Sequence, residues 1–189
     1  MGQRRFCEHH VCFVPAVETP FGPARNDDVV LWLHASAVDA DGQALPLCER
    51  KWDLVQLSPA EPPKAGPRLA NHRAVYRTPI EGDPFRFLEM IGYRFNFEYV
   101  RRGFEFRLGG ARMTIFRVYK LNEQHRISSA VPVDPGSTKW IVELTSPVAG
   151  QEHVVRMSDE LFQFAALLTG LVSLVVVDHT SLQNRIAYS

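Results

Sequence analysis

The sequence has little cysteine, no excess of either charge and no long uninterrupted apolar run. Its 189 residues include three cysteines, and 21 Lys and Arg residues balance 21 Asp and Glu residues. An odd, small number of cysteines with no leading apolar run argues against a secreted disulfide framework. A formal charge of zero excludes long-range attraction to a polyanion as a property of the whole surface.

The longest apolar stretch, Leu161 to Val177, is broken by Gln163, Gly170 and Ser173. It is short for a bilayer span, which needs roughly 20 apolar residues. This stretch is therefore predicted to be buried core. With 46% hydrophobic and 22% charged residues, the chain is predicted to form a single globular domain over residues 1–189.

Short β-branched and aromatic runs between Pro, Gly and Asp clusters predict strands. They cover residues 6–14, 29–38, 51–57, 72–78, 139–145 and 171–178. No alternating strand and helix rhythm separates them, so a doubly wound sheet is not favoured. The pattern predicts an α+β fold built on a mainly antiparallel, strongly curved or closed sheet of about eight strands with two helices.

Two helices are predicted from their start signals. The first helix is predicted to begin with Asp83 as the N-cap and Pro84 at the first helical position, and to end at Gly92. Its predicted buried face is the apolar stripe of Phe85, Leu88 and Ile91. The second helix is predicted to begin at Ser158 and to end at Gly170. Its predicted buried face consists of Leu161, Phe164, Ala165 and Leu168.

Residues 93–121 switch to a period of two, which predicts strands. The alternation would place Tyr93, Phe95, Phe97 and Tyr99 on one face. Gly103 allows a bend or bulge, and Gly109 with Gly110 signals a hairpin. Between Arg94 and Lys120, seven basic and two acidic residues give a local charge of +5. Single-strand nucleic-acid binding is one interpretation, but alternation divides these arginines between two faces.

The segment from Cys7 to Cys12 contains two cysteines and two histidines. In a strand, Cys7 and His9 face one way and His10 and Cys12 the other, so four ligands cannot converge on one ion. No metal site is predicted. The scattered histidines are interpreted as structural: His34, His72, His125, His153 and His179.

Signals of catalysis or cofactor binding are equally scarce. Ser36, Ser128 and Ser129 lack a nucleophile-elbow context, and no phosphate-binding or dinucleotide loop occurs. A phosphohydrolase barrel would need a Glu-x-Glu-x-Lys strand, which is absent, and Glu143 is an isolated carboxylate expected to be solvated or ion-paired. No catalytic and no cofactor-binding residue is predicted.

The segment "FRFLEMIGYRFNFEYVRRGFEFRLGGARMTIFRVYKL" (Phe85 to Leu121) resembles the most recognisable part of the Mediator subunit 18 family. The similarity consists of a short helix, a strand ending in a basic residue and Gly103, a basic hairpin and a strand ending in "VYK". A second similar block runs from Trp140 to Asp178. Together the two blocks cover roughly 75 residues, far longer than a short motif.

The resemblance implies an eight-stranded β-barrel, similar in shape to triphosphate-tunnel enzymes but without their catalytic residues. It implies no enzyme activity, a nuclear location, and a role in transcription regulation within the Mediator head module, which links regulators to RNA polymerase II. Implied partners are Mediator subunit 20, as a heterodimer, and a C-terminal segment of Mediator subunit 8. Partner-binding residues are not assigned.

Family members begin with an additional strand and a helix, whereas this chain begins at "MGQRRFC". The chain is therefore expected to lack that strand and to begin inside the helix. Removing a strand from a barrel leaves an edge that can pair with another chain. An incomplete barrel is the expected result, while a tunnel phosphohydrolase and a single-strand nucleic-acid-binding barrel remain the alternatives.

Overall fold

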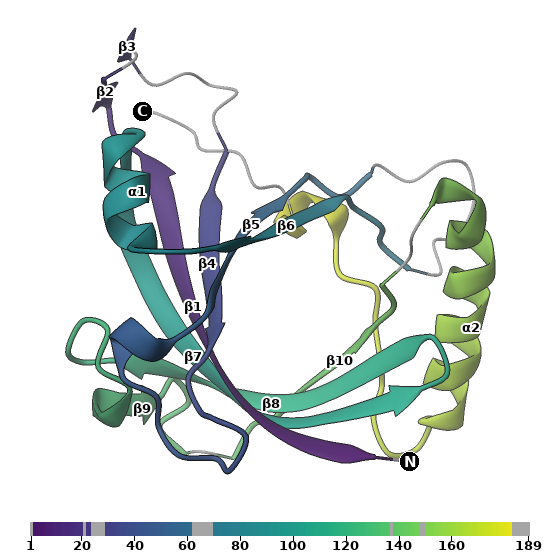
Figure 1. Cartoon of the computed structure of the whole chain (residues 1–189). Helices are drawn as coiled ribbons and strands as arrows, with labels where there is room; N and C mark the ends of the chain where they lie inside the picture. The colour runs from purple at the N-terminus through teal and green to yellow at the C-terminus, as the bar shows by residue number, and fades with distance from the viewer. Residues whose placement is uncertain are drawn as a thin grey trace.

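A computed structural model describes residues 2–20, 22–23, 29–61, 70–136, 138–147 and 150–182. They form an eight-stranded antiparallel sheet in the order β10-β8-β7-β1-β4-β5-β6, with β9 beside β8 (Figure 1). Its strands are β1 (Gln3–Pro15), β4 (Leu31–Ser36), β5 (Trp52–Leu57), β6 (Val75–Ile80), β7 (Tyr93–Leu108), β8 (Ala111–Leu121), β9 (Ala130–Pro132) and β10 (Ile141–Thr145). A small ribbon joins β2 (Glu18–Thr19) to β3 (Gly22–Pro23), and the α-helices are α1 (Pro84–Met90) and α2 (Val154–Leu167).

The sheet curves strongly but does not close (Figure 1). Among the described residues, the two end strands β6 and β10 do not pair with each other. The predicted α+β class and the incomplete form of the barrel are thus confirmed. The expected helical start is wrong, because Gln3 to Phe6 pair with Phe106 to Gly103 of β7 and are part of a strand.

The main apolar core lies between the convex face of the sheet and α1, which sits outside the curve (Figure 1). Strand alternation sends Val11, Phe13 and Leu33 to this face, where they pack with Trp52 and Leu88. A fully buried side chain of this kind stabilises the fold by about 1.5 to 3 kcal/mol. The concave face carries a more polar set of side chains and is described below.

The predicted aromatic face of β7 is split by a β-bulge. Cys12 pairs with Phe97 but Phe13 pairs with Phe95, so Asn96 is the additional residue. Because a bulge shifts the alternation by one residue, Phe95 faces the core beside Phe13. Phe97 instead packs against Trp32 on the concave face. The prediction of one shared face for Tyr93, Phe95, Phe97 and Tyr99 was therefore wrong.

Gly103 does not mark a bulge. The pairing of β7 with β1 and β8 runs through it in continuous register. A Cβ at this position would lie 2.0 Å from the Ile115 carbonyl oxygen and 2.6 Å from the Phe116 Cα. The glycine is therefore required by the close approach of β8, and β7 is one continuous strand.

Helix α1 follows its sequence signals. The Asp83 carboxylate accepts hydrogen bonds from the Phe85 and Arg86 amides, each at 3.1 Å. Leu88 is fully buried, with Phe85 packed on the same core. Gly92 ends the helix at a φ of 90°, a conformation that favours glycine.

Helix α2 begins four residues earlier than predicted. It starts at Val154, and the Ser158 hydroxyl donates to the Val154 carbonyl within the helix instead of capping it. Met157 is buried, whereas the predicted face of Leu161, Phe164, Ala165 and Leu168 is half-buried. None of the described helices is long and apolar enough to cross a membrane.

The last predicted strand does not form. Residues 171–178 have no strand pairing and run from α2 back toward β6, where the Asn71 amide donates to the Val177 carbonyl (Figure 1). Leu171 is 86% exposed and Val175 80% exposed. The expectation that this stretch is buried core was therefore wrong, because valine-rich composition predicts a strand only where an edge is available to pair.

Candidate functional site

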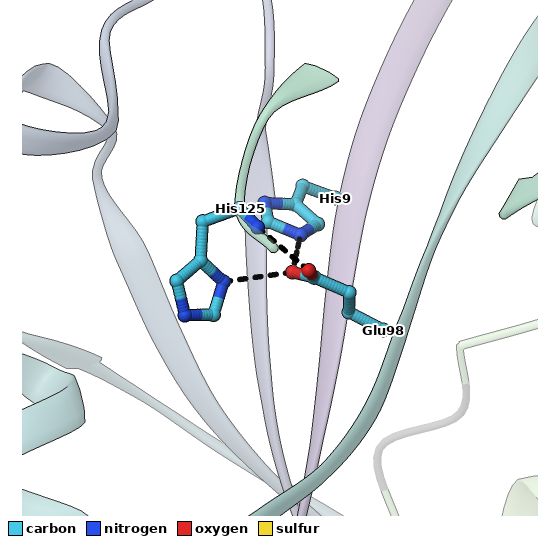
Figure 2. A group of neighbouring side chains, drawn as sticks. All are labelled: His9, Glu98 and His125. Carbon is cyan, nitrogen blue, oxygen red and sulfur yellow. Dashed lines mark hydrogen bonds and ion pairs between the residues drawn. The ribbon is translucent and has the colours of Figure 1, made fainter. Parts of the chain in front are cut away.

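Four polar side chains meet at the convex face and form what we call the Glu98 cluster: His9, Arg50, Glu98 and His125. Figure 2 shows the Glu98 carboxylate between the two imidazole rings. Its Oε2 lies 2.7 Å from His9 Nε2 and 2.8 Å from His125 Nδ1. The His125 backbone amide donates to Glu98 Oε1 at 2.6 Å. One carboxylate therefore joins three donors.

Each member of the cluster comes from a different segment. His9 lies on β1 and Glu98 on β7. They are offset by two residues in the ladder, because His9 pairs with Val100 and Val11 pairs with Glu98. His125 lies in the turn after β8 and has a φ of 61°, which is uncommon for a residue other than glycine. The Arg50 guanidinium is held by the Leu45 carbonyl at 3.0 and 3.1 Å. The cluster ties two strands to two loops.

The hydrogen-bond partners of His9 determine which of its two ring nitrogens carries the proton. Arg50 Nη1 lies 2.8 Å from His9 Nδ1, and a guanidinium can only donate. His9 Nδ1 therefore accepts, and its Nε2 carries the proton that is donated to Glu98. Burial alone would raise the pKa of Glu98, but the hydrogen bonds from His125 and His9 outweigh it and lower the pKa to about 2.

Two histidines and one carboxylate within 4.8 Å of one another could in principle hold a metal ion. A ligating histidine normally donates its second ring N–H to an acceptor. His9 cannot do so, since Arg50 already donates to that nitrogen. Binding a metal at Nε2 would require loss of the remaining ring proton or of the Arg50 contact. The donor set fits a hydrogen-bonded network better than a metal centre.

The sequence pattern did not reveal this cluster. The local pattern groups His9 with its neighbours Cys7, His10 and Cys12, and it predicts no partner for His125. As alternation predicts, Cys7 and His9 share the convex face, while His10 and Cys12 face the concave side. The partner of His9 lies 89 residues away. Its detection requires the pairing of β1 with β7, which no local spacing encodes.

A second network, the Arg101 cluster, lies on the concave face. Its members are Glu8, His10, His34, Arg101, Thr114 and Glu143. Arg101 bonds Glu8 at 2.8 Å and Glu143 at 3.4 Å, and its guanidinium lies over the Phe116 ring. Glu143 also accepts from the Thr114 hydroxyl. The predicted isolated carboxylate is thus an ion-paired residue.

The Arg101 cluster tests the tunnel alternative, since a phosphohydrolase needs carboxylates that are free to bind metal. Two inward carboxylates, Glu8 and Glu143, are engaged by the same guanidinium. Two others on this face are also ion-paired, Asp53 with Arg77 and Glu105 with Arg107 and Arg112. Burial alone would raise the pKa of Glu8, but the hydrogen bonds from His10 and Arg101 hold it well below its usual range. The geometry is that of a neutralised polar network across strands β1, β7, β8 and β10.

Acid should destabilise the protein from about pH 6.5 downward, where histidines in unfolded chains become protonated. Burial lowers the pKa of His9 and of His10, and burial together with His10 and Arg77 lowers that of His34 to about 2. The unfolded chain then binds protons that the folded protein does not. Each such group reduces the free energy of unfolding by about 1.4 kcal/mol per pH unit.

Urea unfolding between about pH 7.5 and about pH 5.5 measures this effect. The slope of the free energy of unfolding against pH is expected to correspond to the uptake of up to three protons on unfolding, one each by His9, His10 and His34. The variant His34→Gln should reduce it by about one proton. A free energy of unfolding that is constant across this range would contradict the assignment of buried neutral histidines.

The arginines between Arg94 and Lys120 divide between the two faces, as alternation predicts. Arg101 faces the concave side with Glu8. Arg102 and Arg117 face the convex side, where they stack on the Tyr119 and Trp140 rings. Arg107, Arg112 and Lys120 share the concave face with Arg101 by the ladder register. Arg101 pairs with Glu8 and Glu143, and Arg107 and Arg112 pair with Glu105. Because these inward arginines are neutralised by carboxylates, they do not form the free cationic lining that a triphosphate tunnel needs.

The other candidate residues form local contacts. The Ser36 hydroxyl donates to the Val38 carbonyl and the Ser129 hydroxyl to the Arg126 carbonyl, both within turns. Three exposed or half-buried histidines pair with a nearby carboxylate: His72 with Glu61, His153 with Glu152 and His179 with Asp178. None of these arrangements combines a nucleophile with a base.

The structure is an open antiparallel sheet with two helices and neutralised polar clusters. A comparison of the sequence with models of known protein families assigns the chain to a family. The model of the family described as Med18 protein matches residues 25–185. The chain belongs to the Med18 family. The resemblance carried by Phe85 to Leu121 is thereby confirmed.

Curated relatives of the Med18 family support this membership. Mediator of RNA polymerase II transcription subunit 18 of Yarrowia lipolytica is 26% identical over 144 residues, which cover 74% of this chain and 60% of that protein. The Drosophila melanogaster subunit 18 is 36% identical over 100 residues, or 51% of this chain and 42% of that protein. The chain therefore spans less than two thirds of the length of these relatives.

Solved structures show the fold shared by this Med18 family member. A chain in the structure of the Schizosaccharomyces pombe Mediator head module superposes with a TM-score of 0.75 at 21% identity, covering 93% of this chain and 86% of that chain. PH1819 protein from Pyrococcus horikoshii OT3 superposes with a TM-score of 0.54 at 15% identity, covering 96% and 85%. At these identities the similarity concerns fold alone.

Proposed function

We propose that this protein is a non-catalytic subunit of the Mediator head module, acting in the nucleus through protein contacts that couple transcription regulators to RNA polymerase II. Membership of the Med18 family over residues 25–185 carries the proposal. Residues 1–189 act as one domain in this proposal. The partners proposed are Mediator subunit 20, as a heterodimer, and the C-terminal segment of Mediator subunit 8.

Exposed apolar side chains support assembly with other proteins. Helix α2 and the segment after it expose Val155, Phe162, Leu167, Leu171 and Val175, with exposed fractions of 55 to 86%. Large exposed apolar patches on soluble proteins mark interaction sites. A groove of about 510 Å³ lies between α2 and residues 170–174. We propose this α2 surface as a docking site for a partner subunit.

Co-expression with tagged subunit 20 and the subunit 8 segment tests the proposal. We expect the chain to be captured with both, and Leu167→Asp together with Leu171→Asp to reduce capture at least tenfold, since charges replace buried apolar contacts. Val17→Asp is the control, because Val17 is also exposed but lies far from α2 in the sequence. Absence of any capture would refute the assembly; equal capture by all variants would refute the α2 surface only.

A further inference from the structure

A groove on the convex face carries a set of arginines that pair with no acidic residue in the described part of the chain. It encloses about 490 Å³ and is lined by strands β1, β7 and β8, the loop between β4 and β5, and the turn after β8. No acidic residue lines it among the described residues. Its principal side chains are Arg5, Arg102, Phe104, Tyr119, Ile127 and Trp140.

Three arginine and aromatic pairs line or border this groove. The guanidinium of Arg5 lies 5.9 Å from the centre of the Phe104 ring, and that of Arg102 lies 4.9 Å from the centre of the Tyr119 ring. The guanidinium of Arg117 lies 4.3 Å from the centre of the Trp140 ring. Stacking orders an arginine while leaving its N–H edge available to a bidentate acceptor such as a carboxylate.

These arginines contrast with Arg101 on the opposite face. Arg101 is paired with Glu8 and Glu143, whereas Arg5, Arg102 and Arg117 have no ion-pair partner among the described residues. Arg102 donates to the Ile127 carbonyl at 3.3 Å and to the Cys7 side chain, and it pairs with no carboxylate of the described residues. Arg117 has a buried Nε without a hydrogen-bond acceptor. The groove thus presents positive charges that are not ion-paired with described residues.

The loop between β4 and β5, which contributes Val38, Gly42 and Ala44 to the groove, carries the aspartates Asp39 and Asp41. The Asp39 carboxylate accepts from the amides of Asp41 and Gln43, so it is used within its own loop. Neither aspartate lines the groove. The Glu98 cluster positions the opposite rim, because it binds His125, two residues before Ile127.

We propose that this groove binds an extended protein segment in which acidic residues alternate with apolar ones. The acidic side chains would pair with the three arginines. The apolar side chains would contact the buried floor, which includes Cys7 and Ile127. This is a binding property of the lone chain and does not depend on membership of the head module.

A protein segment fits better than a nucleic acid. Each of the three aromatic rings already has a guanidinium over it, which takes ring surface that a stacked base would need. The chain as a whole has a formal charge of zero, so it lacks the general attraction that a polyanion would experience. Three local cations suit a short acidic segment.

Fluorescence anisotropy with the purified full chain tests the proposal. The probe is a labelled synthetic peptide alternating Asp or Glu with Leu or Phe, and the control peptide replaces every acid by its amide. We expect the acidic peptide to bind at least about tenfold more tightly, and Arg5→Gln with Arg117→Gln to weaken it by about tenfold for each arginine. Arg156→Gln, at an exposed α2 position, should leave affinity unchanged.

Thermal unfolding checks that each variant is folded. If the double variant does not fold, the affinities of the unsubstituted chain for the acidic and the amide peptide still test whether the groove binds acidic segments. Equal affinity for both peptides, or equal binding by the folded double variant, would overturn the proposal. Tighter binding of single-stranded DNA of the same charge, lost in the same variant, would overturn it in favour of nucleic acid.

Discussion

Replacement of Gly103 by alanine is expected to destabilise the fold more than any other single substitution considered for this chain. The new Cβ would lie 2.0 Å from the Ile115 carbonyl oxygen and 2.6 Å from the Phe116 Cα, both in the backbone of β8. Backbone at the centre of a sheet cannot move without breaking the ladder on both sides. Overpacking commonly costs about 1 to 3 kcal/mol, and we expect at least the upper end.

Urea unfolding of Gly103→Ala measures this loss. The matched control is Gly110→Ala in the same hairpin, where the added Cβ would meet the ends of two flexible side chains, Met157 at 3.0 Å and Glu160 at 3.9 Å, and no backbone. We expect the control to change the free energy of unfolding by less than about 1 kcal/mol. If the two variants were equally stable, the close approach of β7 and β8 would be incorrect.

Glu98→Gln is expected to lower the free energy of unfolding by about 3 kcal/mol. The carboxylate accepts from His9, from His125 Nδ1 and from the His125 amide. An amide group can accept through one oxygen only, so at least one buried donor loses its partner. We expect the midpoint of thermal unfolding to fall by several degrees as the turn after β8 loosens.

Glu123→Gln provides the control on the same turn. Glu123 pairs with Arg126 where both side chains are exposed, and exposed ion pairs contribute about 0 to 1 kcal/mol. Hydrogen exchange would further show faster exchange of the His125 amide in Glu98→Gln and no change in the control. Equal stability of both variants would show that the Glu98 cluster does not hold the turn.

The elements that could be predicted from sequence are those with strong local signals. Asp83, Pro84 and Gly92 defined α1, and Gly109 with Gly110 defined the hairpin between β7 and β8. These signals act through backbone geometry within a few residues, so tertiary contacts rarely override them. The open antiparallel sheet followed from the number and spacing of strands and from the family resemblance.

The features that were missed depend on partners distant in sequence. The bulge at Asn96 arises where β7 pairs with β1, more than 80 residues apart. Glu98 acquires its role from His9 on the same distant strand. Residues 171–178 have the composition of a strand but no paired edge, which composition cannot reveal. Pairing between distant segments is the information that a local pattern lacks.

Light scattering coupled to size exclusion tests the proposed function most directly. The chain would be co-expressed with Mediator subunit 20 and the C-terminal segment of subunit 8, and the mass of the eluting species measured. We expect one peak whose mass equals the sum of one copy of each subunit. Elution of the chain alone at 21.4 kDa, with the other subunits in separate peaks, would contradict it.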